Sequence, residues 1–251
     1  MCPTRTRYFE QHELASLNND KLPKHVAFIP DGNRRWALEH RVHKEEGHRQ
    51  GGNNLIDIVK AAKELDIKVI TFYLFSTENW ARPQEEINAL MWLLHSFLIE
   101  QRPIMLDYGI KLHTIGVLDR LAEYVQTTIQ HTKDATDHCQ GIDMVLALNY
   151  GSRDEICRAI RTIAGQIARK EISEESISED LIASHLDTAA WPDPDLLIRT
   201  SGEMRLSNYL LWQLSYSEIY VTNILWPSFR PKHLLEALLN YQTRQRRLGT
   251  Q

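Results

Sequence analysis

The stretch HVAFIPDGNRRWALEH, residues 25–40, decides the fold class, because an apolar segment in it leads directly into a glycine turn. Residues 26–29 are apolar and partly β-branched, which is typical of a buried parallel strand. Pro30 ends the strand, Gly32 can adopt positive φ, and Asn33 can cap a following helix. The stretch therefore predicts a strand, a tight turn and a helix that opens at Arg34.

The same turn carries charged residues in an arrangement that suits an anion. Free N–H groups and the dipole at a helix start favour a phosphate, and Arg34 and Arg35 could clamp it. Asp31 could hold a divalent cation against that phosphate. An ordinary loop with a capping Asn33 and two solvated arginines explains the stretch equally well, so these residues alone leave both interpretations open.

Strand and helix signals alternate along the rest of the chain. Apolar runs predict strands at residues 68–75, 110–117, 142–151 and 195–202. Helical spacing predicts helices at 51–65, 83–98, 121–132, 154–168, 207–214 and 231–247, and a turn with a helix start at 171–181. This alternation predicts an α/β fold with a mostly parallel central sheet and helices on both faces. We expect a polar N-terminal extension over residues 1–22 and a single domain over residues 23–248.

Composition limits the classes of function. The 251 residues are 43% hydrophobic and 25% charged, with a formal net charge of −4, so wholesale nucleic-acid binding is not expected. Three widely spaced cysteines suggest neither a disulfide framework nor a zinc motif. The sequence has no signal-peptide pattern and no run of about 20 apolar residues. We expect a cytoplasmic protein that can touch a membrane surface.

Polar and cationic residues gather where the predicted strands end. The strand ends carry residues 31–35, 76–82, 149–151 and 199–205. In doubly wound sheets, ligands bind beyond the carboxyl ends of the strands. Three of these ends supply arginine beside Ser, Asn or Gly, which indicates an anionic ligand with more than one phosphate. The pattern favours the anion-site interpretation of the opening stretch.

Four segments together resemble the motifs of the cis-prenyltransferases, whose typical bacterial member is undecaprenyl diphosphate synthase. They are HVAFIPDGNRRWA, FSTENWARPQEEINALM, LNYGSRDEI and DLLIRTSGEMRLSNYLLWQLSYSEIYVTNILWPSF. The resemblance holds in order and spacing and extends from about His25 to Arg247. It is highly specific, because four separate motifs recur in one order.

The resemblance implies an activity, a cofactor and partners. Members condense an allylic diphosphate such as farnesyl diphosphate with successive isopentenyl diphosphates, form each new double bond in the Z configuration, and use Mg²⁺. They lack a DDxxD metal motif, and the nearest approach to one here is interrupted by Pro194. The family also implies a homodimer and a long polyprenyl product, here of the undecaprenyl type. Residues 72–75 and 87–98 supply apolar side chains for a substrate tunnel.

The resemblance also implies roles for individual residues. Asp31 and Asn79 match catalytic positions, and Asp31 and Glu218 match acidic residues associated with the metal. The allylic diphosphate would be bound by Gly32, Asn33, Arg34, Arg35, Trp36, Lys44, His48 and Arg82. Ser76 and Trp80 match supports of the ENW motif, and Arg199, Arg205 and Ser207 match binders of isopentenyl diphosphate. An amide is a poor base, so we expect Asn79 to orient the substrate, and a diphosphate oxygen is a plausible proton acceptor.

Some positions depart from the family pattern. Arg34 stands where many members have a second glycine, Lys44 where many have arginine, and Met204 where several have histidine, which puts affinity for the allylic substrate in question. Leu74 stands where long-chain members often have alanine, so it is a candidate determinant of product length. A plain core leucine is an equally good interpretation of Leu74.

Other functions remain open at this point. A short-chain or medium-chain cis-prenyl diphosphate synthase is the alternative if Leu74 closes the tunnel. A non-catalytic prenyltransferase-like subunit would be expected to have lost Asp31, Asn79 or the arginines, and the sequence retains all of them. A generic phosphate-binding module would explain the cationic strand ends but not the long apolar elements.

Overall fold

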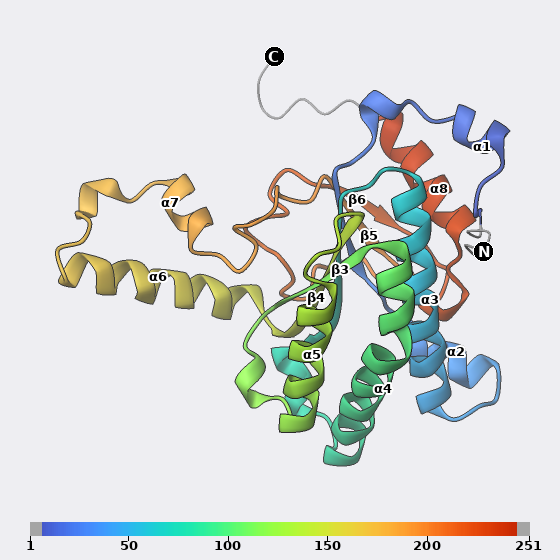
Figure 1. Ribbon diagram of the computed structural model, residues 1–251, viewed down its shortest axis with the longest axis horizontal. Helices are drawn as coiled ribbons and strands as arrows, with labels where there is room; N and C mark the ends of the chain where they lie inside the picture. Colours follow the sequence, from blue (N-terminus) through green and yellow to red (C-terminus); the bar gives the residue numbers. More distant parts are fainter. Residues whose placement is uncertain (1–6, 245–251) are drawn as a thin grey trace.

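A computed structural model describes residues 7–244, and in that part of the chain six parallel strands form one sheet (Figure 1). The strands are β1 (His25–Ile29), β2 (Val69–Ser76), β3 (Ile110–Ile115), β4 (Ile142–Tyr150), β5 (Leu196–Arg199) and β6 (Glu218–Val221). Their order in the sheet is β3-β4-β2-β1-β5-β6. The central position of β1 places its carboxyl end between those of β2 and β5.

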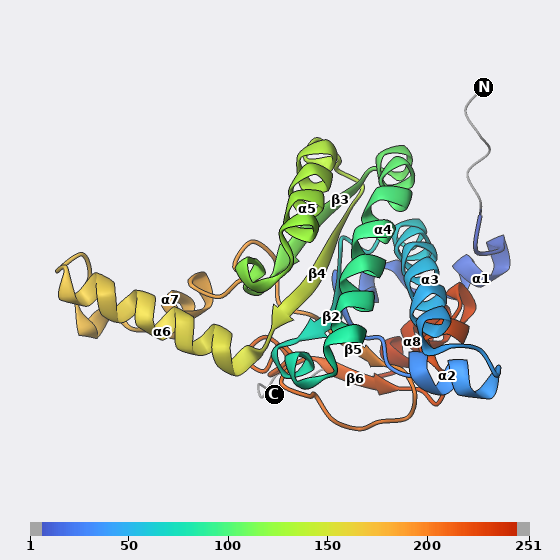
Figure 2. The same ribbon diagram turned by 90° about the horizontal axis from the view of Figure 1, so that it is seen from below.

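The described residues contain no helix between β5 and β6. Helices connect the earlier strands, and several of them cover one face of the sheet (Figure 2). They are α1 (Gln11–Ala15), α2 (Asn33–Glu39), α3 (Lys44–Glu64), α4 (Gln84–Tyr108), α5 (Glu123–Thr136), α6 (Ser152–Ala168), α7 (Glu179–Ser184) and α8 (Pro231–Gln242). None of the helices within residues 7–244 is long and apolar enough to span a bilayer.

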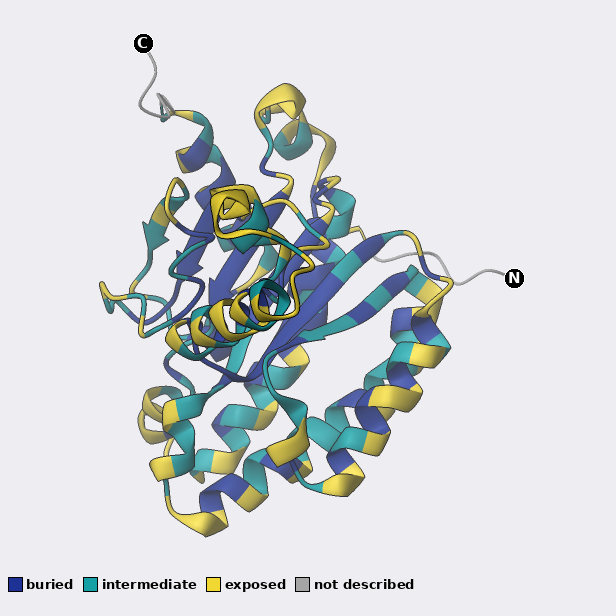
Figure 3. Ribbon diagram, turned by 90° about the vertical axis from the view of Figure 1, so that its left-hand side faces the viewer, coloured by how far each residue is buried: buried dark blue, intermediate teal, exposed yellow. Residues whose placement is uncertain are grey.

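Successive side chains of each strand point to opposite faces of the sheet, so the sheet has an apolar layer on each face. Val26 and Phe28 point to the face where α3, α4, α5 and α8 supply their buried side chains, and together they form the main core. Ala27 and Ile29 point to the opposite face, where Trp191 and residues 206–214 supply the covering side chains. Figure 3 shows that the strands are mostly buried while the helices expose their outer surfaces.

The second face differs from the expectation of a helical layer. Residues 207–214 were expected to form a helix, but they form turns, because Ser207, Asn208 and Leu210 have φ values of 52°, 63° and 44°. Positive φ is incompatible with a right-handed helix. These turns cover the second face, while α6 and α7 extend sideways from the body (Figures 1 and 2). The α/β class and the parallel sheet are confirmed.

Other boundaries shift in ways that have local causes. The helix expected from residue 51 begins at Lys44, and the last helix ends at Gln242, while residues 245–247 lie outside the described part. The short edge strand β6 was not predicted, because its four residues, one exposed and three half-buried, carry little periodic signal. Phe9 is 4% exposed and packs into the main core, so the segment before β1 contributes to it. The boundary at residue 22 stays a prediction.

Candidate active site

A polar pocket of about 800 Å³ opens beyond the carboxyl ends of β1, β2 and β5. Most of the predicted site residues line it, namely Asp31, Gly32, Asn33, Arg34, Arg35, His48, Leu74, Ser76, Asn79, Arg82, Arg199, Arg205 and Ser207. Five arginines and three carboxylates, those of Asp31, Glu78 and Glu203, belong to the lining. The excess of positive charge suits an anionic ligand.

Asp31 and Arg199 form an ion pair at the centre of the pocket. Nη2 of Arg199 donates to Oδ2 of Asp31 at 2.9 Å, and Nη1 donates to Oγ of Ser207 at 3.0 Å. Arg199 Nη1 also donates to the carbonyl of Arg205. Thr200 Oγ1 accepts from the Asp31 amide at 2.8 Å and donates to its carbonyl at 2.7 Å. Arg199 at the end of β5 therefore orients the Asp31 carboxylate, and Thr200, the next residue, fixes the Asp31 backbone.

The turn after β1 brings two helices close together. Gly32 has a φ of 108°, a value that side chains other than glycine rarely tolerate, and it is the N-cap of α2. On α3, a Cβ at Gly47 would lie 2.2 Å from the Asn33 carbonyl, and one at Gly51 would lie 2.5 Å from Asn33 Oδ1. Both glycines are needed for α3 to approach the start of α2.

His48 presents an unsatisfied ring nitrogen to this region. Its Nδ1 lies 3.4 Å from Asn33 Nδ2, while its Nε2 and Asn33 Oδ1 are buried without a protein partner among residues 7–244. Burial, with a further contribution from the positive charge of Arg82, lowers the pKa of His48 to about 4. His48 is therefore neutral at pH 7, and its Nε2 can hydrogen-bond a ligand in the pocket.

Glu86 is a central residue that the sequence analysis did not identify. Its side chain is 3% exposed, and it binds Arg34 Nη2 at 2.6 Å, Arg82 Nη1 at 3.0 Å and Lys44 Nζ at 3.5 Å. Burial alone would raise its pKa, but the three cations outweigh that effect and lower it. The four-residue spacing of Arg82 and Glu86 was the one sequence signal for this cluster.

A second carboxylate joins two of the predicted phosphate binders. Glu203 lies 3.5 Å from Arg35 Nη2 and also pairs with Arg205. These side chains are 36% to 58% exposed, so the pairs are easily exchanged for a ligand. Glu203 therefore stands between the residues assigned to the allylic diphosphate and those assigned to isopentenyl diphosphate.

The ENW motif forms a tight turn at the end of β2. Asn79 Oδ1 accepts from the Ser76 amide at 3.2 Å in a capping box, which fixes the amide side chain. Trp80 Nε1 donates to Asn149 Oδ1 at 2.7 Å and its ring packs edge-on against Phe75. Asn79 thus lines the pocket, whereas Trp80 supports the turn from behind.

Trp36, Lys44 and Glu218 do not line the pocket. Trp36 Nε1 donates to Ser228 Oγ at 3.0 Å, and its ring stacks on His40. Lys44 reaches Glu86 instead. Glu218 begins β6 beside Leu196, the first residue of β5, so within one chain it lies at the opposite end of the sheet from Asp31, paired with Arg244 at 2.7 Å. Its metal role stays a prediction.

An apolar pocket of about 210 Å³ continues from the polar one between α3 and α4. The two pockets share the residues Pro30, Asn33, His48, Tyr73, Leu74 and Leu90. Leu55, Leu94 and Phe97 belong to the apolar lining, together with Trp226 from beneath. Leu74 stands at the junction of the two pockets. The arrangement suits an amphiphile with an anionic head and an apolar tail.

Asp31 is the residue in the pocket best suited to a metal ion. Its side chain is 33% exposed and its ion pair with Arg199 uses Oδ2. Within residues 7–244 no group of three or more His, Cys, Asp or Glu could hold a metal by itself. A carboxylate beside a phosphate site fits Mg²⁺, which commonly takes one or two carboxylates and completes its shell with phosphate oxygens and water.

The chain matches a known family over most of its length. The family described as "Putative undecaprenyl diphosphate synthase" matches residues 29–249. An isoprenyl transferase of Chlamydia abortus is 46% identical over 96% of this chain and 98% of its own length. An isoprenyl transferase of Clostridium tetani is 44% identical over 93% of this chain and 91% of its own length.

Solved structures show the same likeness in three dimensions. Lavandulyl diphosphate synthase from Lavandula x intermedia, solved in complex with dimethylallyl diphosphate, is 37% identical with a TM-score of 0.88, over 90% of this chain and 98% of that one. A probable undecaprenyl diphosphate synthase from Campylobacter jejuni is 32% identical with a TM-score of 0.76, over 91% of this chain and 99% of that one.

Proposed function

Since this chain belongs to the undecaprenyl diphosphate synthase family of cis-prenyltransferases, we propose that it condenses isopentenyl diphosphate units onto an allylic diphosphate such as farnesyl diphosphate. The product is a long polyprenyl diphosphate of the undecaprenyl type. The observation that carries this proposal is the continuity of a cationic pocket with an apolar one through Leu74. Both reactants are diphosphates with apolar tails, and the two pockets match those two chemistries.

We propose that the allylic diphosphate binds at the start of α2. The backbone N–H groups there, with Arg34, Arg35 and Arg82, provide donors for its phosphate oxygens, and His48 Nε2 provides another. Glu86 holds Arg34 and Arg82 in place from below. Isopentenyl diphosphate is placed beside it, on Arg199, Arg205 and Ser207. Trp36 and Lys44 then act as supports of the binding loop rather than as ligands.

Catalysis consists of stabilising the departing diphosphate and positioning the incoming alkene. A bound Mg²⁺ would neutralise negative charge that develops on the diphosphate. Asp31 would hold that ion, because Arg199 already orients its carboxylate and Thr200 fixes its backbone. The arginines share the same anionic charge. Asn79 has its amide oxygen bound to the Ser76 backbone, which supports an orienting role.

Product length is the finer part of the proposal. Leu74 lines both pockets, so the growing chain passes its side chain. If Leu74 blocks that passage, the enzyme is a short-chain or medium-chain synthase, which is the alternative. Leu74→Ala then lengthens the product, and Leu74→Met, of similar volume, preserves it. An unchanged length in Leu74→Ala assigns Leu74 to plain packing.

Assembly and membrane contact are further parts of the proposal. A homodimer is supported by the exposed edge strand β6, where Ile219 is 45% exposed beside Tyr216 at 69%. We also propose that the protein is cytoplasmic and touches a membrane surface in passing, and the exposed side chains of Trp92, Ile99 and Leu106 support that contact. They recur every seven residues on α4 and are 59%, 48% and 40% exposed.

In the decisive experiment, the purified chain is incubated with farnesyl diphosphate, labelled isopentenyl diphosphate and Mg²⁺, with and without EDTA. The chain lengths of the products are then measured by chromatography. We expect a ladder that requires the metal and ends near eleven isoprene units. A ladder that stops much shorter supports the alternative. Absence of incorporation with several allylic primers would assign the chain to non-catalytic prenyltransferase-like subunits.

A further inference from the structure

The segment that precedes β1 is fastened to one face of α3. The amide of Tyr8 donates to Glu64 Oε2 at 2.9 Å, and the Tyr8 hydroxyl donates to Asp57 Oδ1 at 3.0 Å. Lys60, between them on the helix, lies 3.0 Å from Asp57 Oδ1 and 5.6 Å from the centre of the Tyr8 ring. Phe9 continues from this attachment into the main core.

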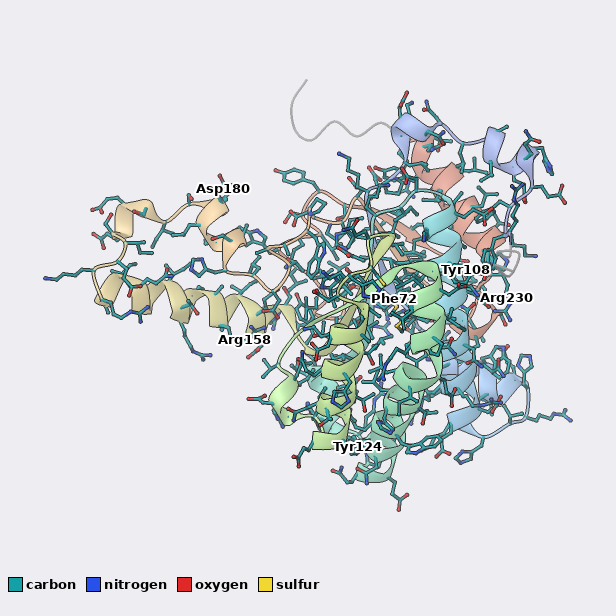
Figure 4. All side chains as sticks on the ribbon, viewed as in Figure 1. Phe72, Tyr108, Tyr124, Arg158, Asp180 and Arg230 are labelled. Carbon is teal, nitrogen blue, oxygen red and sulfur yellow. The ribbon has the colours of Figure 1, made fainter. Side chains whose placement is uncertain are left out.

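The same lysine also contacts the end of α4. Lys60 Nζ lies 5.1 Å from the ring centre of Tyr108, the last residue of α4, and is 12% exposed. Lys63 binds the carbonyl of Tyr108. Figure 4 shows Tyr108 beside α3. Tyr8, Lys60 and Tyr108 thus form one contact, here called the far clamp, which ties the N-terminal segment to the ends of α3 and α4.

The far clamp lies at the end of the seam that the apolar pocket enters. The polar pocket lies at the starts of α3 and α4, and the apolar pocket reaches Leu55 on α3 and Phe97 on α4. Beyond those positions the seam is closed by buried side chains, which include Ile58, Val59, Ala62, Leu98 and Met105, all 0% exposed. From Leu90 to Tyr108 the helix axis covers about 27 Å.

We infer that the far clamp sets an upper limit on product length. The inference rests on the proposed function, because it requires a chain that grows from the polar pocket along the α3–α4 seam. Such a chain can displace adaptable apolar side chains such as Met105. At the end it meets a lysine ammonium held between two aromatic rings, and further growth would bring hydrocarbon against that charge. The Tyr8 ring covers Lys60 at that end of the seam.

The test compares Tyr8→Ala with the matched control Tyr8→Phe in two parent chains, the wild type and Leu74→Ala. The second parent is included so that a stop at Leu74 does not hide the far clamp. Each chain is incubated with farnesyl diphosphate, Mg²⁺ and saturating isopentenyl diphosphate, and the longest product is measured. We expect Tyr8→Ala to add at least one isoprene unit in one or both parents. Tyr8→Phe keeps the ring over Lys60 and should leave the length unchanged.

A second variant keeps the inference testable if Tyr8→Ala folds poorly. Lys60→Met keeps the stem of the side chain and removes the charge, so it should also lengthen the product. Loss of stability alone lowers total incorporation and does not extend the ladder, which makes product length the informative measurement. The inference is overturned if neither variant lengthens the product in either parent while incorporation persists. Absence of any product from both parents would instead overturn the proposed function.

Discussion

Arg199 binds Asp31 across the carboxyl ends of β5 and β1, with 2.9 Å between Nη2 and Oδ2. The two side chains differ in exposure, at 5% for Arg199 and 33% for Asp31. The guanidinium is therefore a buried support, which Ser207 also holds, while the carboxylate still faces the pocket. This asymmetry makes the Asp31 carboxylate the more accessible member of the pair, although both residues line the pocket.

Asp31→Ala and Asp31→Asn should both reduce condensation by about a hundredfold or more, the order of effect for losing a group that stabilises developing charge. Asn keeps the size and an acceptor for Arg199, so it separates the charge from the packing. Steady-state rates at several Mg²⁺ concentrations provide the measurement. Thermal unfolding serves as the control for an intact fold. Wild-type rates in Asp31→Asn would rule out the metal assignment.

Glu86 should matter for binding of the allylic substrate and for stability. Glu86→Gln leaves Arg34, Lys44 and Arg82 without their shared carboxylate, so mutual repulsion disperses them. Losing a buried charge partner costs about 3–5 kcal/mol, and partial exposure of the three cations reduces this to about 2 kcal/mol. We expect the KM for farnesyl diphosphate to rise more than the KM for isopentenyl diphosphate.

Glu85 provides the matched control for Glu86, because it occupies the same helix turn and is exposed. Glu85→Gln should leave both KM values and the urea midpoint near those of the wild type. Equal effects of the two variants would show that Glu86 acts through general helix stability and not through the arginines.

The sheet and the polar pocket could be predicted because both depend on local patterns. Apolar runs that end in Gly, Asn or Arg mark parallel strands, and the carboxyl ends of such strands meet at one edge. Asp31, Ser76 and Arg199 therefore came together as expected. This agreement concerns their position, and their chemical roles stay predictions.

Features that depend on distant contacts could not be predicted in the same way. Glu86 looked like a residue at an acidic helix start, and its importance comes from packing against Arg34 and Lys44 on two other helices. Residues 207–214 have helix-like apolar spacing, yet positive φ at Ser207 and Asn208 turns the chain. Phe9 belongs to a segment with a polar sequence, yet its side chain packs in the main core through contacts with residues distant in the chain.

His25 should make the protein less stable in mild acid. It is fully buried, with Nδ1 2.7 Å from the Pro192 carbonyl and Nε2 2.7 Å from Thr71 Oγ1, and burial lowers its pKa to about 4. In the unfolded chain the pKa of His25 is about 6.5, so between pH 6.5 and pH 4 the unfolded chain binds more protons than the folded chain. The free energy of unfolding therefore falls as pH falls through this range. Above about pH 6.5 the effect of His25 on the free energy of unfolding no longer changes with pH. Between that pH and pH 4 His25 changes the free energy of unfolding by about 3 kcal/mol.

Urea midpoints at pH 7.5, 6 and 4.5 would measure this dependence. His25→Gln should flatten the slope in part, since His48 has a shift of the same sign and remains. His43→Gln is the control, because that side chain is exposed. An unchanged slope in His25→Gln would remove His25 as a cause of the acid sensitivity.

Gly51 and Gly52, adjacent on α3, should respond in opposite directions to alanine. A Cβ at Gly51 would lie 2.5 Å from Asn33 Oδ1 and 2.9 Å from Trp226 Cδ1, whereas at Gly52 the nearest atom is Phe97 Cδ2 at 3.7 Å. Replacing glycine inside a helix stabilises it by about 0.5–1 kcal/mol. We therefore expect a higher melting temperature for Gly52→Ala. Gly51→Ala should lose about 1–3 kcal/mol through overpacking.

The Gly51 variant should also weaken substrate binding, because the displaced Asn33 stands at the start of α2, the proposed binding site of the allylic diphosphate. Melting temperatures of both variants and the KM for farnesyl diphosphate of Gly51→Ala test these expectations together. A stabilised Gly51→Ala with an unchanged KM would mean that α3 can move away from Asn33 without cost. In that case the close approach of α2 and α3 would not be what shapes the binding loop.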